Sequence, residues 1–407
     1  MIDYAHILKN LIFKAGGDVL TLLIIADDFT GSLDSGVQFA QRGANVKVVT
    51  DSNYNFTDSE NESLDVLIFD SETRHLAPDK AYKIVRDFVS RSNVPYIYKK
   101  TDSGLRGNIG AELAACMDAL NFDSLVFVPA FPAMNRITKN GVHYIDGVPV
   151  AKSMFGADPF EPVKFSSVQE IISSQTSKTG IKIFDAESDS DMMRIAENNN
   201  LRLSAGCAAF AGILANVLGF NGQAAKIPEM PAKFFMICGS VNPITRAQVD
   251  FAAKHGFKKI SLSVAQKLSP SWPDSQECKD FAKKCLDEIK NFNAILDANN
   301  ENDNKATQEF IRANNLSIDE VRLNISRSVT GAAKNLLDLG LDSRLMCVGG
   351  DTLLALMQSV NVSELIPICE LAKGVVLTSF IYSGKIYYIM TKSGGFGEAD
   401  LLVKLAK

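Results

Sequence analysis

The stretch TLLIIADDFTGSLDSGVQFAQRGANVKVVT, residues 21–50, carries the pattern that decides the fold. It opens with an apolar run typical of a buried strand, continues as a helical pattern over residues 32–42 that stops at Gly43, and ends in a second strand. The same alternation continues through DVLIFD, residues 78–90, PYIYKK, residues 108–120 and SLVFVPA. Fully apolar strands separated by helices predict a parallel, doubly wound sheet with flanking helices.

The length of 407 residues predicts two domains, because single cores stop growing at roughly 250–300 residues. After a predicted hairpin in GVHYIDGVPV, the αβ pattern resumes at GIKIFDA and the helical SAGCAAFAGILANVL, and a Gly- and Pro-containing linker spans residues 221–233. FFMICGS then opens a second α/β series. We predict a short helical extension over residues 1–20 and domains over 21–225 and 226–407. The Asn-rich residues 291–304 are expected to form a surface insertion.

Composition excludes several classes of protein. A net charge of −5 without a long basic run argues against nucleic-acid binding, and no apolar stretch of about 20 residues is present to span a membrane. The seven cysteines form no CxxC pair, which indicates reduced thiols in a cytoplasmic protein. None of the four histidines has a ligand-like spacing to a cysteine, so a zinc site is not expected. The N-terminus lacks the pattern of a signal peptide.

Glycine- and aspartate-containing loops follow four predicted strands, in IIADDFTGS, YKKTDSGLRG, CVGGDT and TKSGGFG. Glycine lets backbone N–H groups approach an anion closely, and a helix N-terminus adds roughly half a positive charge. The loops form two pairs far apart in sequence, as expected of an enzyme that joins a nucleotide to a small anionic substrate. Neither GxxxxGK[ST] nor GxGxxG is present, which excludes a Walker A loop and a dinucleotide fingerprint.

Asp27 and Asp28 close the first strand, where ligands of open α/β sheets bind. One of them would accept a hydrogen bond or a proton from a substrate hydroxyl; alternatively, one caps the next helix. In KTDSGLRG, Arg106 suits a carboxylate or phosphate and Asp102 suits a sugar hydroxyl. The alternative there is an internal Asp–Arg ion pair that holds the loop.

Further candidates carry less information in isolation. Arg136 follows VPAFP, and His143 in the hairpin is expected to be structural. In CGSVNPIT, Ser240 and Thr245 either bind a ligand or cap the helix that follows.

Taken together, IIADDFTGSLDSG, KTDSGLRGNIGAE, VPAFP with the later arginine, CGSVNPITRAQ, GGDT and KSGGFG resemble the four-carbon acid sugar kinases over the chain beyond residues 1–20. The resemblance implies an N-terminal sugar-acid-binding domain, a C-terminal nucleotide-binding domain and an active site in the interdomain cleft. It implies a phosphotransferase that uses ATP and Mg²⁺ to phosphorylate the C4 hydroxyl of D-threonate, D-erythronate or 3-oxo-tetronate.

The matching positions fall into two groups. The sugar-acid motifs contain Asp27, Asp28, Lys100, Asp102, Ser103, Arg106 and Arg136. The nucleotide motifs contain Ser240, Gly349, Gly350, Asp351, Thr352, Gly394 and Gly395. The resemblance implies that Asp28 or Asp102 is the catalytic base. It also implies that Arg106, with or without Arg136, holds the substrate carboxylate. It does not assign the metal ligands.

The chain departs from the family pattern at three places, which bear on substrate identity more than on reaction type. Gly104 stands where the family usually has threonine, Asn135 where it has glycine, and Asn242-Pro243 where it has small polar residues. Two other functions are compatible with the sequence: a non-catalytic sugar-acid sensor, and an oxidoreductase on a related fold. The expected partners are a small sugar acid and ATP, with no nucleic acid and no membrane, and a homodimer is a candidate assembly.

Overall fold

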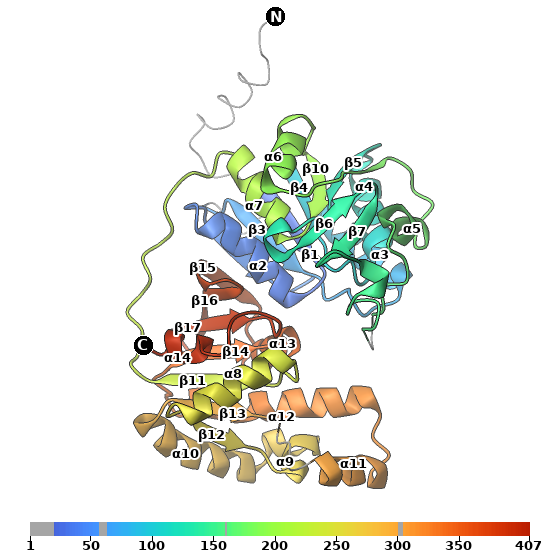
Figure 1. The fold of residues 1–407 in the computed structure, drawn as a ribbon. Coiled ribbons are helices and arrows are strands. Elements are labelled where there is room, and N and C mark those ends of the chain that lie inside the picture. The colour runs from blue at the N-terminus through green and yellow to red at the C-terminus, as the bar shows by residue number, and fades with distance from the viewer. Residues whose placement is uncertain (1–19, 57–62, 159–160, 300–303) are drawn as a thin grey trace, which may run out of the picture. The chain divides into compact units, whose positions relative to one another are not determined.

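The computed structural model describes residues 20–56, 63–158, 161–299 and 304–407 (Figure 1). Contacts between Cα positions divide the chain into two compact units. The first contains the residues up to 27 together with 42–222, and the second contains residues 28–41 together with 223–407. The helix predicted within residues 1–20 falls outside the described residues, except for Leu20.

A seven-stranded parallel sheet forms the first unit, in the order β2-β3-β1-β4-β10-β5-β9. Strand β1, which lies between β3 and β4, is buried along its whole length, and this explains its uninterrupted apolar sequence. Because all seven strands are parallel, their carboxyl ends lie along one edge of this sheet. The strands are β1 (Leu22–Ala26), β2 (Val46–Val49), β3 (Val66–Asp70), β4 (Tyr96–Lys100), β5 (Leu125–Val128), β9 (Ile181–Ile183) and β10 (Leu203–Gly206).

Helices cover this sheet on both faces. Helices α3 and α4 pack together, as do α6 and α7, and the two pairs lie on different sides of the strands in Figure 1. Helix α3 begins with Pro78 in its first turn and buries Ala81, Val85, Phe88 and Val89, the spacing expected of an amphipathic helix. The helices are α3 (Pro78–Arg91), α4 (Ile109–Leu120), α5 (Val168–Ser173), α6 (Asp189–Glu197) and α7 (Ala208–Val217).

One strand of this sheet was not predicted. Residues 204–206, expected to belong to a helix, form strand β10 between β4 and β5, and only residues 208–217 are helical. Alanine-rich sequence favours a helix locally. In the sheet, however, a Cβ at Gly206 would collide with the carbonyl oxygen of Val128, so the small residues are a consequence of close packing.

The predicted hairpin is confirmed. Strands β6 (Arg136–Lys139), β7 (Val142–Ile145) and β8 (Val148–Pro149) form a small antiparallel sheet. Asp146 and Gly147, which connect β7 and β8, have φ angles of 49° and 79°, the left-handed conformation of a two-residue hairpin turn.

The second unit also contains a mostly parallel sheet, in the order β12-β13-β11-β14-β17-β16-β15. The pairs from β12 to β17 are parallel, and β16 pairs antiparallel with both β17 and β15. The strands are β11 (Phe234–Cys238), β12 (Lys258–Ser261), β13 (Ala294–Asp297), β14 (Arg344–Val348), β15 (Glu364–Ala372), β16 (Val375–Tyr382) and β17 (Lys385–Lys392).

Helices flank this second sheet as well, and α12 packs against α9, α10 and α13. Helix α2, although it follows β1 in sequence, groups with this unit and contacts β15 and α13. The helices are α2 (Phe29–Ala40), α8 (Pro243–Lys254), α9 (Val264–Leu268), α10 (Gln276–Asn291), α11 (Asn304–Ala313), α12 (Ile318–Asp338), α13 (Gly350–Ser359) and α14 (Leu401–Leu405).

The Asn-rich segment is not a surface insertion over its whole length, contrary to the prediction. Ala294–Asp297 forms β13, which is fully buried and pairs with both β11 and β12. The sequence signal was the four-residue run AILD, too short to stand out among the surrounding asparagines.

The predicted reduced thiols agree with the structure, in which all seven cysteines are buried and free. Among the described residues, no helix combines the length and apolar character needed to cross a bilayer.

Candidate functional site

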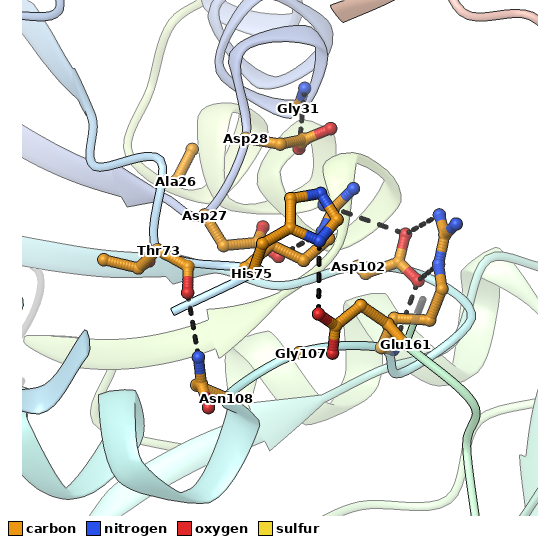
Figure 2. A network of polar contacts seen from close by, with 12 residues as sticks. Ala26, Asp27, Asp28, Gly31, Thr73, His75, Asp102, Gly107, Asn108 and Glu161 are labelled. Carbon is orange, nitrogen blue, oxygen red and sulfur yellow. Dashed lines mark hydrogen bonds and ion pairs between the residues drawn. The ribbon is translucent and has the colours of Figure 1, made fainter. Parts of the chain in front are cut away.

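Asp27 and Asp28 leave the end of β1 in different environments (Figure 2). Asp27 is 1% exposed; its Oδ2 accepts a hydrogen bond from Arg74 Nε at 2.8 Å, and its Oδ1 has no hydrogen-bond partner among the described residues. Asp28 is the N-cap of α2, accepting from Gly31 N at 3.0 Å and from Thr30 Oγ1 at 2.8 Å. The helix-capping alternative therefore applies to Asp28, whereas Asp27 keeps one buried carboxylate oxygen without a hydrogen-bond partner among the described residues.

Asp102 and Arg106 form the internal ion pair that was the alternative to ligand binding. Arg106 Nε and Nη2 donate to the two carboxylate oxygens of Asp102 at 2.9 and 3.1 Å, and Nη1 donates to Asp158 at 3.1 Å. Burial alone would raise the pKa of Asp102, but the positive charges of Arg106 and Arg74 hold it well below its usual value. The charge of Arg106 is thus balanced within the protein, and Asp102 is a poor proton acceptor.

Arg136 contrasts with Arg106, because it has no carboxylate within ion-pair distance among the described residues. Its Nη1 donates to the hydroxyl of Ser103, and burial lowers its pKa. Lys100 is 5% exposed, and its ammonium makes no hydrogen bond or ion pair with the described part of the chain. Burial raises the pKa of the Cys207 thiol, whereas the positive charges of Lys100 and Arg136 lower it. Both cations therefore lie near this thiol, which directly follows β10.

A buried lysine and a half-buried arginine without a carboxylate partner are costly unless an anion neutralises them. They come from the ends of β4 and from β6, and they converge at the carboxyl edge of the sheet, where ligands of such folds bind. The arrangement can therefore bind a small anion.

His143 is structural, as expected. It is fully buried, its Nδ1 lies 3.0 Å from Thr138 Oγ1, and its Nε2 lies 3.0 Å from the carbonyl oxygen of Ser103. Burial lowers its pKa to about 4, so the ring is neutral at physiological pH. Its place in the site is to hold the backbone of the loop that carries Ser103.

A second polar network supports these loops from inside and was not predicted. Lys99 Nζ contacts Glu112 Oε2 at 2.8 Å and donates to the carbonyl oxygens of Ile25 and Lys100 at 3.2 and 2.7 Å. Glu112 Oε1 accepts from Thr73 at 2.5 Å. All three ammonium protons have acceptors, so Lys99 ties β1 and β4 together and is not available to a ligand.

In the second unit, glycine-containing loops follow the neighbouring strands β11, β14 and β17 and contact one another. A Cβ at Gly394 would lie 2.9 Å from Ser240 Oγ, and Thr245 Oγ1 donates to the carbonyl oxygen of Gly394 at 2.9 Å. A Cβ at Gly239 would collide with Thr352 Oγ1. The motifs GS, GGDT and KSGG therefore lie close together at the ends of these three strands.

The first turn of α13 presents backbone amides at this place. Gly349 is its N-cap with φ of 105°, a conformation that favours glycine, and the helix begins at Gly350. Thr352 is 4% exposed, whereas the Asp351 side chain is 63% exposed and pairs with Arg322 at 2.8 Å. Asn242, not Ser240 or Thr245, accepts the capping hydrogen bond of α8, from Ile244 N at 3.0 Å.

Lys392, at the end of β17, stands in the motif TKSGGFG but was not predicted to be a site residue. It is 1% exposed, and its ammonium donates to the carbonyl oxygens of Ser393 and Gly394 at 2.8 and 3.2 Å. Burial lowers its pKa to about 8, and no carboxylate among the described residues lies within ion-pair distance of it. The sequence signal that could have identified it is a lysine that closes an apolar predicted strand, two residues before a Gly-Gly pair.

Asp297 and Arg246 form a buried brace beside these loops that the sequence did not reveal. Arg246 donates to both oxygens of Asp297, at 2.8 and 2.9 Å, and Lys259 contacts Asp297 Oδ2 at 3.1 Å. Asn299 Nδ2 extends the network to the carbonyl oxygen of Ser240 at 3.1 Å. This network fixes the position of the loop that carries Ser240.

Two family models match this chain, one in each half. Residues 22–182 match a sugar-binding N-terminal domain, and residues 235–402 match a nucleotide-binding C-terminal domain. The first match contains Asp27, Lys100 and Arg136, and the second contains Ser240 and the three glycine loops.

Relatives that cover most of the chain, and one that covers part of it, carry kinase names. The D-threonate kinase of Salmonella typhimurium strain LT2 is 26% identical over 94% of this chain and 97% of its own length. The D-erythronate kinase of Heliobacterium modesticaldum is 25% identical over 93% and 94%. The 3-oxo-tetronate kinase of Escherichia coli strain K12 is 28% identical over 39% of this chain and 42% of its own length.

Solved structures support the fold. A crystal structure from Salmonella typhimurium LT2 matches with a TM-score of 0.79 at 18% identity, covering 95% of this chain and 99% of its own. Haemophilus influenzae protein HI1011 matches with a TM-score of 0.72 at 19% identity, covering 94% and 98%. With a sugar-binding and a nucleotide-binding domain and kinase relatives over nearly its whole length, the chain belongs to the four-carbon acid sugar kinase family.

Proposed function

We propose that this sugar-acid kinase transfers the γ-phosphoryl group of ATP to the C4 hydroxyl of a four-carbon acid: threonate, erythronate or 3-oxo-tetronate. The observation that supports this most is the pair of cations formed by the buried Lys100 and the half-buried Arg136, which lack a carboxylate partner among the described residues. A sugar acid supplies the missing negative charge. Its carboxylate can accept two parallel hydrogen bonds from a guanidinium.

Arg136, together with Lys100, is proposed to bind the substrate carboxylate. Arg106 was the first choice from the resemblance, but its guanidinium already contacts two carboxylates, those of Asp102 and Asp158. Three of the five N–H groups of Arg106 already donate to these carboxylates, and the two negative charges neutralise its positive charge, which weakens its attraction for a further carboxylate. Arg136 has no such competing carboxylate among the described residues.

The substrate hydroxyl is proposed to bind Asp27. Its Oδ1 is buried and has no hydrogen-bond partner among the described residues, so a hydroxyl donor there would satisfy it. Arg74 at 2.8 Å orients the carboxylate. Asp28 and Asp102, the two candidates for the catalytic base from the resemblance, fit this role less well. Asp28 uses its carboxylate to cap α2, and the pKa of Asp102 lies well below its usual value. Phosphoryl transfer depends mainly on positioning and charge neutralisation, so a well-placed carboxylate suffices.

The nucleotide phosphates are proposed to bind the amides of residues 349–352 and 394–395, with the Ser240 hydroxyl and the Lys392 ammonium beside them. Within the described part of the chain, the Lys392 ammonium donates only to carbonyl oxygens, so a phosphate would supply the negative charge that this buried cation lacks. A P-loop serves as a chemical precedent for a lysine beside backbone amides.

Mg²⁺ fits this loop set as an ion held largely by phosphate oxygens. Mg²⁺ in kinases is bound through one or two carboxylates together with substrate phosphates. Asp351 would supply one such carboxylate, because its side chain is largely exposed at the first turn of α13. No group of three or more acidic, histidine or cysteine residues that could hold a metal occurs in the described ranges, in line with a site completed by the nucleotide. The ion would neutralise charge on the transferred phosphoryl group.

The test is ADP release with Mg-ATP across four-carbon sugar acids, with tartrate and longer aldonates as controls. Rapid turnover on one tetronate supports the proposal and identifies the substrate. ADP at background level on all of them contradicts it. A melting shift with a tetronate but no turnover would indicate the sensor function. The assembly state stays a prediction, which light scattering in solution checks.

A further inference from the structure

Phe155 lies in the segment that follows the small antiparallel sheet, and its ring is held firmly. The residue is 7% exposed and belongs to the hydrophobic core of the first unit. Its backbone N–H donates to Ser153 Oγ at 3.2 Å, and its carbonyl oxygen accepts from Val163 N at 3.0 Å. The ring therefore has a defined position.

Arg136 of the proposed sugar-acid site and the neighbouring Arg106 both lie over this ring. The Cζ atoms of Arg106 and Arg136 are 5.1 and 5.0 Å from the ring centroid, within the range of cation–π attraction. The same segment supplies Asp158, which accepts from Arg106 Nη1 at 3.1 Å. The two arginines thus share one aromatic support but differ in their charge partners.

An aromatic face holds a guanidinium differently from a carboxylate. A carboxylate fixes the cation by accepting its N–H groups, which are then unavailable to a ligand. An aromatic ring attracts the cation through its face and accepts none of the in-plane hydrogen bonds. Arg136, which donates only to Ser103 among the described residues, is therefore oriented while most of its donors stay available.

Gly104 makes room for the ring. A Cβ at this position would lie 2.5 Å from one ring carbon of Phe155 and 2.6 Å from another. Its own backbone N–H donates to Asp102 Oδ2 at 3.1 Å, so the glycine has little freedom to move away. The departure from threonine at this position has a structural reason in this chain, because any side chain would displace the ring.

We propose that Phe155 is a positioning residue that orients the Arg136 guanidinium toward the substrate carboxylate, and that Gly104 is required for this placement. The binding part of this proposal rests on the proposed function. The orienting part does not, because it concerns the protein without ligand. Removing the ring is expected to weaken sugar-acid binding without affecting the nucleotide.

The first experiment follows the Nε–Hε resonance of Arg136 in the ligand-free ¹⁵N-labelled protein, assigned by its loss in Arg136→Lys. In the wild type the signal is expected to be sharp and dispersed. In Phe155→Leu and in Gly104→Ala it should broaden or move toward the signals of solvated arginines. An unchanged resonance in both variants would overturn the proposal, whatever the substrate is.

The second experiment measures tetronate and ATP dissociation constants by calorimetry. Phe155→Leu is expected to weaken tetronate binding about tenfold with ATP binding unchanged. Gly104→Ala should act similarly, and the double variant should be no worse than Phe155→Leu alone, because leucine leaves room for the new methyl group. The matched control is Phe122→Leu, which removes the Arg202 cation–π contact of 5.3 Å elsewhere in this unit.

The outcomes distinguish a failure of the proposed role of Phe155 from a failure of the proposed substrate. Tetronate affinity within twofold of wild type in Phe155→Leu, or fully additive losses in the double variant, would overturn the role of Phe155. If wild-type protein binds no tetronate, the proposed substrate is wrong, and the resonance of Arg136 alone then decides whether Phe155 orients it. A loss of folding is recognised by a lowered melting temperature in the same samples.

Discussion

Replacing Arg136 by glutamine is expected to weaken sugar-acid capture selectively. The wild-type guanidinium would make two charge-assisted hydrogen bonds to the carboxylate, each contributing about 1.5–3 kcal/mol. Lys100 remains as a second cation, so the lower value applies to each bond and the loss is about 3 kcal/mol. That corresponds to roughly a hundredfold decrease in kcat/KM for the sugar acid. Because Arg136 has no carboxylate partner among the described residues, its removal leaves no protein carboxylate unpaired.

The assay varies the sugar acid at saturating Mg-ATP, and then varies ATP at saturating sugar acid, with ADP release as the readout. Arg106→Gln is the matched comparison. It removes the contacts to Asp102 and Asp158, and it leaves Asp102 buried with Arg74 at 3.9 Å. Its main effect should therefore be a melting temperature lowered by several degrees. If Arg136→Gln keeps the sugar-acid KM within threefold while Arg106→Gln raises it at unchanged stability, the assignment is reversed.

Three further predictions follow from the site. With a pKa of about 8, Lys392 loses its proton as pH rises, so ADP affinity measured by calorimetry should fall from about pH 7 to about pH 9. Lys392→Met should remove this pH dependence of ADP affinity, and an unchanged pH dependence in the variant would exclude a contact between Lys392 and the phosphates. Arg246→Met leaves the buried Asp297 without its bidentate partner and should lower the free energy of unfolding by about 3 kcal/mol in denaturant titrations, whereas unaltered stability would show that the brace is not needed. Asp27→Asn should reduce kcat more than Asp28→Asn at equal ATP affinity, and the opposite order would return the base role to Asp28.

Strands and helices with a strong pattern were predictable. The strand in residues 22–26 is buried on both faces, so its sequence is apolar throughout, and the helix at residues 78–91 shows its buried face through the spacing of its apolar residues. Strands β10 and β13 were missed because each has only four residues, one rich in small residues and the other flanked by asparagines. The antiparallel strands β15 and β16 were not predicted either, and β15 is exposed at alternate positions.

Local sequence identified the loops that we propose to carry the chemistry, because glycines, aspartates and basic residues at strand ends mark where a parallel sheet binds ligands. It did not determine which charges are already balanced. The sequence favoured Arg106 over Arg136 as the ligand of the substrate carboxylate. In the structure, however, Arg106 contacts Asp158, which lies 52 residues away, and Arg136 contacts no carboxylate among the described residues. Likewise, Phe155 reaches Gly104 only through the folding of the chain. Ion pairing and ring contacts depend on distances between residues far apart in sequence, and only the tertiary structure sets those distances.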